Sequence, residues 1–293
     1  MALSFCLMSL RSLLAIVAGV MINAIAQGRC GWLMHEAGHT SLTGNAPLDK
    51  RIQELVYGAG CGMSAAWWRS QHNKHHAVPQ KLEHDVDLET LPLVAFNRRI
   101  VERLGPGPHI KRFLSTQAYT FAPLLCLLIG LSWSLYVHPR HIVRTRRAFE
   151  ALCCAARYVG WCALMYQMGY SWCGSIGVYV MSFALACTYI FVNFAVSHTH
   201  LPVTEADEHL HWIEYGALHT TNIRNSAFVT WWMCFLNFQI EHHLFPTMPQ
   251  FRHPLIAPRV SRLFAKHGLP YDSRPYTRAI RDTFANLRAV GTT

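Results

Sequence analysis

The sequence predicts an all-α integral membrane protein with about three to four transmembrane helices. Of its 293 residues, 52% are hydrophobic and 14% are charged, whereas about 25% of residues are charged in soluble globular domains. A transmembrane helix needs about 20 consecutive, mostly apolar residues. Four segments meet this requirement, namely residues 3–26, 113–137, 148–170 and 174–196. Composition and segment length therefore both favour a multi-pass membrane protein.

The first apolar segment, residues 3–26, is expected to be a transmembrane helix. Its position at the N-terminus and Arg11 in its middle raise the alternative of a cleaved signal peptide. The apolar run is long for a signal peptide, and no small-residue cleavage site follows it. We therefore assign it as a membrane span.

Residues 30–112 are mostly polar and form the first part of a predicted helical cap. Within them, residues 52–68 are half apolar but contain several glycines and tryptophans, which argues against a membrane crossing. We expect helices that lie on or near the membrane surface.

Residues 113–137 are expected to form a re-entrant or interfacial segment. Pro123 and Gly130 interrupt this apolar run, and both residue types weaken a helix. If the segment crossed the membrane, the histidine-rich residues 72–76 and 242–243 would lie on opposite sides of the bilayer. A segment that returns to its starting side keeps these histidines together.

A basic cluster at residues 140–147 gives an independent argument for this topology. It lies between two apolar runs, as the cytoplasmic loops of membrane proteins do. Three crossings would place it on the side opposite to His72, against the positive-inside tendency. We therefore predict further spans near residues 148–170 and 174–196.

The C-terminal residues 197–293 are mostly polar and form the second part of the cap. Their one apolar stretch, residues 228–238, is too short to cross a bilayer. No internal repeat and no Pro- or Ser-rich linker divides the chain. Residues 1–293 are therefore predicted to be a single domain, in which membrane spans carry a cytoplasmic helical cap.

Composition also argues against two other classes of protein. The formal charge is +10, but the basic residues do not form a patch interleaved with aromatic residues, so no nucleic-acid partner is expected. The ten cysteines lie mostly in apolar segments without a Cys-x-x-Cys pair. Neither a disulfide framework nor a thiolate metal site is therefore indicated.

The eighteen histidines are unusually many. Imidazole is the commonest metal ligand in proteins, and residues three or four positions apart share one helical face. Four groups have suitable spacing: His35-Glu-Ala-Gly-His39, His72-Asn-Lys-His75-His76, Ser197-His198-Thr-His200 and Gln239-Ile-Glu-His242-His243. All four can converge at one membrane surface, within the cap.

The first group by itself matches the HExxH pattern of zinc metallopeptidases, in which Glu36 would be the general base. Such a site needs only one more protein ligand and an open water position. Three further histidine groups have no role in it. A membrane zinc peptidase therefore stays open only as an alternative.

Eight or more histidines are too many for one zinc ion but suit two metal ions. Imidazole suits iron, copper, nickel and zinc, so spacing alone does not identify the metal. Two iron ions at a membrane surface could activate dioxygen and attack an inert C–H bond of a lipid chain. The sequence therefore predicts a histidine-rich dimetal site held by the cap.

These motifs together resemble those of the membrane fatty-acid desaturases, which are marked by three histidine boxes of the forms HxxxH, HxxHH and HxxHH. The boxes correspond here to HEAGH, HNKHH and QIEHH. Gln239 replaces the first histidine of the last box, which resembles the front-end branch, whose members act on polyunsaturated acyl chains between an existing double bond and the carboxyl end. The resemblance covers about residues 27–259, and QIEHHLFPTMP is its most specific part.

The resemblance implies a ligand set for two iron ions. Gln239 is implied as a weak ligand or a hydrogen-bond partner of one, Asn193 as a residue that reaches the metal through water, and Glu36 and Glu241 as carboxylates that orient a ligand ring. The implied metal ligands are His35, His39, His72, His75, His76, His198, His242 and His243.

The resemblance also implies the reaction and its partners. Dioxygen and two electrons would introduce a cis double bond into a polyunsaturated acyl-CoA or phospholipid. Cytochrome b5 and its reductase would supply the electrons, and the protein would lie in the endoplasmic reticulum with its active site on the cytoplasmic face. The histidine boxes leave open a lipid hydroxylase of the same di-iron class.

The chain departs from the family pattern at its N-terminus. It lacks the haem-binding His-Pro-Gly-Gly segment of a fused cytochrome b5 domain, and the apolar span that usually precedes the first box span is also missing. We therefore expect an N-terminally truncated chain, and an inactive truncated desaturase is a further alternative.

The remaining histidines are not assigned as ligands. Five lack partners at ligand spacing and are expected to be ordinary surface or interface residues: His109, His138, His141, His253 and His267. The others are His84, His200, His209, His211 and His219.

Overall fold

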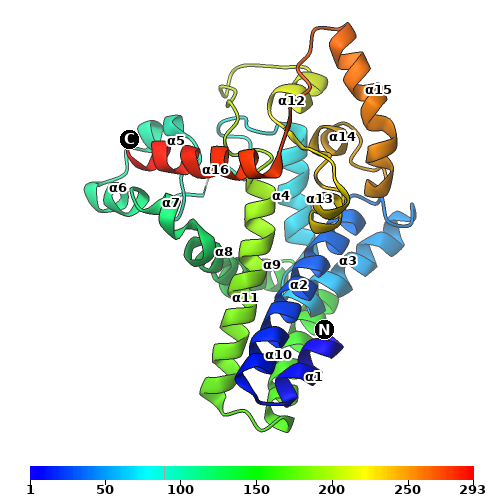
Figure 1. The fold of residues 1–293 in the computed structure, drawn as a ribbon, viewed down its shortest axis with the longest axis vertical. Coiled ribbons are helices and arrows are strands. Elements are labelled where there is room, and N and C mark those ends of the chain that lie inside the picture. Colours follow the sequence, from blue (N-terminus) through cyan, green and yellow to red (C-terminus); the bar gives the residue numbers. More distant parts are fainter. Residues whose placement is uncertain (89) are drawn as a thin grey trace. The chain divides into compact units, whose positions relative to one another are not determined.

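The computed structural model describes residues 1–88 and 90–293 and is built almost entirely of helices (Figure 1). The chain forms two compact units, each made of two segments. Unit 1 comprises residues 1–68 and 122–191, and unit 2 comprises residues 69–121 and 192–293. The prediction of an all-α chain is confirmed, whereas the single domain stays a prediction.

Among the described residues, four helical segments have the length and apolar composition needed to cross a membrane. They are Leu13–Gly38, Gln117–Arg144, Ala148–Gln167 and Trp172–Ala195. This number agrees with the predicted three to four transmembrane helices.

Unit 1 contains the long apolar helices. Shorter helices join them, and the bounds of both kinds are α1 Ala2–Ser9, α2 Leu13–Gly38, α3 Ala46–Cys61, η1 Phe121–Leu125, α8 Cys126–Ser132, η2 Trp133–Val137, α9 His138–Arg144, α10 Ala148–Gln167 and α11 Trp172–Ala195. Helix α4, Ala65–Ala77, begins at the end of the first segment of unit 1, and η1 and α11 each have one end in unit 2.

The predicted first span is divided into two helices. The chain breaks after α1, where Arg11 has a φ of 56°, and Ser12 caps α2 by accepting a hydrogen bond from the Ala15 N–H. Helix α2 then continues to Gly38. It therefore starts and ends later than the predicted span 3–26, and its last turns carry the HEAGH motif.

Small residues on α2 allow it to pack closely against α11 in unit 1. A Cβ atom added at Gly28 would lie 2.4 Å from Cδ1 of Tyr189, and one added at Gly31 would lie 3.0 Å from Cδ1 of Ile190. Trp32 completes the contact, with its ring centroid 4.5 Å from that of Tyr189. Glycines commonly permit such close approach between membrane helices.

The apolar run 113–137 is interrupted before Pro123 and is helical at Gly130. Ala122 has non-helical dihedral angles, φ −113° and ψ 121°, because a residue before proline avoids the α region. Gly130 lies inside α8 and against Cys187, where an added Cβ would come within 2.4 Å of the sulfur. The predicted interruption at Gly130 is therefore wrong, since this glycine serves packing. The re-entrant path stays a prediction.

A buried polar network holds the start of α4 in unit 1. The Ser64 hydroxyl donates to Glu150, which also accepts a hydrogen bond from the Ala66 N–H at 3.0 Å. The Ser64 N–H donates to Nδ1 of His138 at 2.8 Å. Free N–H groups at a helix start need such acceptors, so the first turn of the helix that carries the HNKHH motif is well fixed.

Unit 2 contains shorter helices joined by loops. Their bounds are α5 Arg98–Leu104, α6 Pro108–Leu114, α7 Gln117–Thr120, α12 Trp212–Leu218, α13 Ala227–Trp232, α14 Gln239–Leu244, η3 Gln250–Arg252, α15 His253–Lys266 and α16 Tyr276–Gly291. Two short parallel strands, β1 Asn222–Ile223 and β2 Ser273–Arg274, join the loops before α13 and α16.

Of the apolar clusters in unit 2, two position α14 and α16. One packs Ile240 and Leu244 of α14 against Val260 and Phe264 of α15. Another packs α16 through Ala279 against Met233 and Val196. Figure 1 shows α16 running past α5 and α7 within this unit. The short α14 also contacts β1, so it lies between α15 and a strand, and both contacts fix its orientation.

Candidate metal centre

His72 and His76 of α4 lie one turn apart and begin a first imidazole group. Their Nε2 atoms are 3.1 Å apart. The ligand nitrogens of these two residues and of His242 on α14 all lie within 4.8 Å of one another. Two nitrogens bound to one ion, each at about 2.1 Å, lie within about 4.2 Å of each other. The spacing therefore suits neighbouring positions on one metal ion.

A second imidazole group consists of His75, His198 and His243. Their ligand nitrogens also lie within 4.8 Å of one another. The ring centroid of His198 is 4.9 Å from those of both His75 and His243. All three side chains are buried. They come from α4, from the turn after α11 and from α14, so the group needs three distant parts of the chain.

Each histidine doublet divides between the two groups. Neighbouring residues on a helix point about 100° apart, so His75 and His76 face different groups, as do His242 and His243. The rings of His76 and His243 stack with their centroids 4.2 Å apart. The two groups therefore lie side by side in unit 2, which explains why the sequence uses doublets.

Asp85 holds the ring of His75. Its carboxylate oxygens lie 3.0 and 3.1 Å from Nδ1 of His75. Burial by itself would lower the pKa of His75, but the carboxylates of Asp85 and Asp87 outweigh it and raise that pKa to about 9. The Nδ1 hydrogen bond leaves Nε2 of His75 for a metal ion, and a carboxylate partner makes a histidine a stronger ligand.

Asp87 contributes mainly charge to this arrangement. Its oxygen is 3.6 Å from Nδ1 of His75, and its side chain is half exposed. His75, Asp85 and Asp87 have ligand atoms within 4.8 Å of one another. Because Asp85 lies at hydrogen-bond distance from the ring, we assign it to orientation rather than to a separate metal site.

A backbone carbonyl holds the ring of His198. Nδ1 of His198 lies 3.1 Å from the carbonyl oxygen of His219, so the ring donates there and presents Nε2. Burial, followed by the charge of His75, lowers the pKa of His198 to about 3. His198 is therefore neutral near pH 7, which is the form that binds metal.

The QIEHH motif forms α14, every residue of which is buried. Asn222 of β1 fixes it through two contacts, since its Oδ1 accepts from the Ile240 N–H at 2.9 Å and its Nδ2 donates to Glu241 at 2.8 Å. The Tyr271 hydroxyl also donates to Glu241 at 2.8 Å. Burial raises the pKa of Glu241, and these two donors partly offset the rise.

Gln239 and Asn193 are both buried in unit 2. Oδ1 of Asn193 accepts a hydrogen bond from the Tyr276 hydroxyl at 2.9 Å, and Tyr276 accepts one from Trp232 at 3.2 Å. The amide oxygen of Gln239 is buried without a hydrogen-bond partner among the described residues. Their predicted roles toward a metal stay predictions, as does the ring-orienting role of Glu241.

His35 and His39 form a pair at the end of α2 in unit 1. They are 1% and 7% exposed, and their ring centroids are 4.7 Å apart. Both rings contact Trp68, at 5.3 and 6.0 Å. Glu36 between them is half buried. The spacing of four thus places both imidazoles on one face, as predicted.

The structure corrects the assignment of two histidines as surface or interface residues. His138 and His253 are both fully buried. His138 serves the α4 network, and the ring centroid of His253 lies 5.9 Å from that of His242. Burial lowers the pKa of His253 to about 4. Isolated histidines in the sequence gave no sign of burial, because burial depends on packing.

Sequence reasoning missed the groups that hold the candidate ligands in place: Asp85 beside His75, the backbone carbonyl of His219 beside His198, and Asn222 beside α14. Asp85 follows the HNKHH motif by nine residues, so an acidic residue shortly after a histidine box could have suggested it. Asn222 and His219 carry no such signal, since their contacts come from loops distant in sequence.

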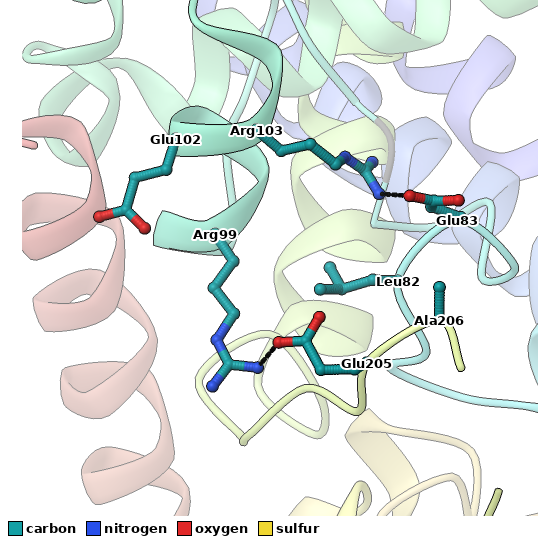
Figure 2. Close-up of a pocket in the computed structure, with 7 residues that line it drawn as sticks. All are labelled: Leu82, Glu83, Arg99, Glu102, Arg103, Glu205 and Ala206. Carbon is teal, nitrogen blue, oxygen red and sulfur yellow. Dashed lines mark hydrogen bonds and ion pairs between the residues drawn. The ribbon is translucent and has the colours of Figure 1, made fainter. Parts of the chain in front are cut away.

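A charged surface groove in unit 2 is separate from the imidazole groups. Its volume is about 440 Å³, and none of its lining residues is a histidine. Figure 2 shows Arg103 paired with Glu83 and Arg99 paired with Glu205 across it. These pairs connect α5 to the loops that follow α4 and α11.

The donor set of unit 2 fits two metal ions. Each group gathers three imidazoles. In the second group, Nδ1 of His75 lies at hydrogen-bond distance from a carboxylate, and Nδ1 of His198 lies at hydrogen-bond distance from a backbone carbonyl. Hydrogen bonds of this kind are typical of histidines that bind metal. Imidazole does not by itself distinguish iron from zinc. The arrangement therefore supports metal binding and leaves the element to other evidence.

Comparison with known proteins gives the family. Residues 11–275 match the fatty acid desaturase family. An acyl-lipid (8-3)-desaturase of Thraustochytrium sp is 59% identical over 291 residues, and one of Rebecca salina is 58% identical over 275 residues. Fatty acid desaturase 3 of Bos taurus is 32% identical over 283 residues.

These relatives are longer than the chain. The alignments cover 99%, 93% and 92% of this chain but 66%, 64% and 60% of the respective relatives. The chain thus spans about two thirds of their length, and this part includes every histidine group described above. With a family match over most of its length, the chain belongs to the fatty acid desaturase family.

Proposed function

We propose that the chain carries the catalytic part of a front-end acyl-lipid desaturase, which introduces a cis double bond into a polyunsaturated acyl chain with O2 and two electrons. The observation that carries the proposal is the division of both histidine doublets between two neighbouring imidazole groups. A mononuclear zinc peptidase site has no use for such a division.

We propose two iron ions as the cofactor. His72, His76 and His242 would hold one ion. His35 and His39 are proposed as further iron ligands on the sequence motif HEAGH alone. The second ion would be held by His75, His198 and His243. Gln239 and Asn193 would contribute a weak or water-mediated contact, and Glu36 and Glu241 would orient ligand rings.

Bound iron would supply the oxidising power that removes two hydrogens from adjacent methylene groups while O2 is reduced to two waters. The protein groups prepare the site for this chemistry. Burial of His75, His198, His242 and His243 keeps bulk water away from these rings, and burial keeps His198 neutral. Asp85 and the His219 carbonyl each fix one ring by its Nδ1–H, so the Nε2 lone pairs point to fixed positions.

An acyl lipid is the substrate that the relatives suggest. Two of them are named acyl-lipid (8-3)-desaturases, and Gln239 in place of a histidine resembles the front-end branch. The four helices that are long and apolar enough to cross a membrane would hold the chain where such lipids lie. Acyl-CoA is the alternative carrier.

We further propose cytochrome b5 and its reductase as electron donors and the endoplasmic reticulum as the location, with the active site on the cytoplasmic face. The net charge of +10 suits an acidic electron-transfer partner.

The central experiment expresses the chain with cytochrome b5 and its reductase, supplies C18 and C20 polyunsaturated acids, and analyses the fatty-acid methyl esters. A product lighter by two hydrogens supports desaturation. A product heavier by one oxygen would instead indicate a hydroxylase, and no product from stably expressed protein would remove the proposed activity for this chain.

Metal analysis of the same preparation tests the cofactor. About two irons per chain are expected from eight histidine ligands. Zinc alone in protein purified with its native metal would count against the redox reaction. A peptidase would lose its activity on Glu36→Gln and keep it on His242→Ala, which is the opposite of what a dimetal site requires.

A further inference from the structure

Gln80 lies where the supports of two proposed ligands meet in unit 2. It follows α4 in a turn, has a φ of 60° and is 2% exposed. Its backbone N–H donates to Oδ2 of Asp85 at 2.7 Å. That oxygen also lies 3.0 Å from Nδ1 of His75. The backbone of Gln80 thus fixes the carboxylate that orients His75.

The side chain of Gln80 reaches the segment that carries His198. Its Nε2 donates to the carbonyl oxygen of His198 at 2.8 Å and to that of Leu201 at 3.3 Å. The ring of His198 is held separately, through the carbonyl of His219. His198 is therefore fixed at both its backbone and its ring.

Backbone hydrogen bonds strengthen the same connection. The Thr204 N–H donates to the carbonyl oxygen of Gln80, and the Leu82 N–H donates to the carbonyl oxygen of Thr204, both at 3.0 Å. The segment after α4 and the segment after α11 are therefore paired directly beside the second imidazole group. A shift of either segment would change the separation of His75 and His198, whose ring centroids are 4.9 Å apart.

We propose that Gln80 is a positioning residue that couples His75 to His198 and thereby sets the metal affinity of the second imidazole group. This inference rests on the proposed dimetal function. Gln80 acts through other residues, since its Nε2 donates to two carbonyl oxygens and its backbone N–H donates to Asp85. Residues that orient metal ligands typically change metal affinity about 10- to 100-fold when mutated.

The chain offers a matched control for this role. Gln117 is also fully buried in unit 2. Its Nε2 donates to the carbonyl oxygens of Ala95 at 2.9 Å and of Leu287 at 2.8 Å. Both glutamines therefore join two backbone carbonyls, but only Gln80 does so beside a proposed ligand. Gln80→Glu and Gln117→Glu each keep the side-chain length and replace the amide donor with oxygen.

The test titrates the metal-stripped full chain with Co²⁺ in detergent and follows its visible absorption, with thermal unfolding measured in parallel. The wild-type chain is expected to bind about two ions. Gln80→Glu should bind one of them about 10- to 100-fold more weakly, whereas Gln117→Glu should bind both like the wild type despite a similar loss of thermal stability.

Gln80→Gly provides a second variant if Gln80→Glu does not fold. Glycine accepts the positive φ without strain, so it removes the side chain while easing the backbone, and the same weakening is expected. If the Gln80 variant that folds binds metal as tightly as Gln117→Glu does, the inference is overturned, and the proposed function is left intact. A wild-type chain that binds no Co²⁺ would overturn both.

Discussion

At the residue scale, hydrogen bonds to the ring nitrogens decide what each histidine can do. His75 and His198 both have Nδ1 engaged, one by Asp85 and one by the His219 carbonyl. Each therefore presents Nε2 in a fixed direction. His138, by contrast, uses Nδ1 to accept the Ser64 N–H, so its role is to support α4.

His243→Ala tests the second imidazole group. Removal of one of three ligands should lower the metal content toward one ion per chain and reduce desaturated product below detection. The measurements are metal analysis and chromatography of fatty-acid methyl esters. His267→Ala, at an exposed residue, is the control and should retain both. Full product from His243→Ala would contradict its assignment as a ligand.

Asp85→Asn tests the carboxylate that orients His75. The amide keeps the size of the side chain but removes the charge, so metal affinity and product formation should fall about 10- to 100-fold. Glu83→Gln is the matched control, because Glu83 lies in the same loop. Its side chain is 57% exposed and forms an ion pair with Arg103 at the protein surface. Equal activity of the two variants would show that Asp85 has no special role.

At the element scale, close packing of helices and fixed helix starts determine where the motifs lie. Gly28 lets α2 approach α11, and the HEAGH motif follows on the last turns of the same helix. Glu150 and Ser64 fix the first turn of α4, which carries the HNKHH motif. The two helices that bear these boxes are thus both held by contacts within unit 1.

Gly28→Ala should destabilise unit 1. Its new Cβ would meet the Tyr189 ring at 2.4 Å, and overpacking of this kind costs about 1–3 kcal/mol. Gly177→Ala in α11 is the control, since an added Cβ there meets no atom within 4 Å. Thermal unfolding of the two purified variants should separate them, and equal melting temperatures would show that the α2–α11 contact tolerates a methyl group.

Glu150→Ala should loosen the start of α4. The change removes an acceptor from the Ser64 hydroxyl and the Ala66 N–H, and a buried donor left unsatisfied costs about 1–3 kcal/mol. Glu102→Ala is a suitable comparison, because its ion pair with Arg98 is solvent-exposed and such pairs contribute about 0–1 kcal/mol. Hydrogen exchange of residues 65–77 should increase in the first variant only.

At the scale of the whole molecule, bound metal should stabilise the folded chain by mass action. Ligand at 100 times its dissociation constant adds about 2.7 kcal/mol per site. A chelator should therefore lower the melting temperature by several degrees, and Fe²⁺ should restore it. His243→Ala should show a smaller difference between chelated and metal-loaded protein. No response of the wild type to the chelator would argue against structural coupling of the metal site.

The sequence was sufficient for much of the fold class and for the grouping of histidines on shared helical faces. Apolar segments of about 20 residues predicted the long helices, and the spacings HxxxH and HxxHH predicted shared faces on α2 and α4. The break after α1 was missed because the apolar run continues through Arg11, whose positive φ ends the helix. The burial of His253 was missed because it depends on packing beside α14.

By itself, the sequence determined which residues can act together locally, since helical periodicity fixes the relation between positions three or four apart. Only the tertiary structure decided which group each imidazole of a doublet joins, and which residues hold the rings. His75 meets His198 across 123 positions of the chain through Asp85, Gln80 and the loop at residues 201–204. Such contacts depend on how loops fold back on one another, and no local spacing encodes that path.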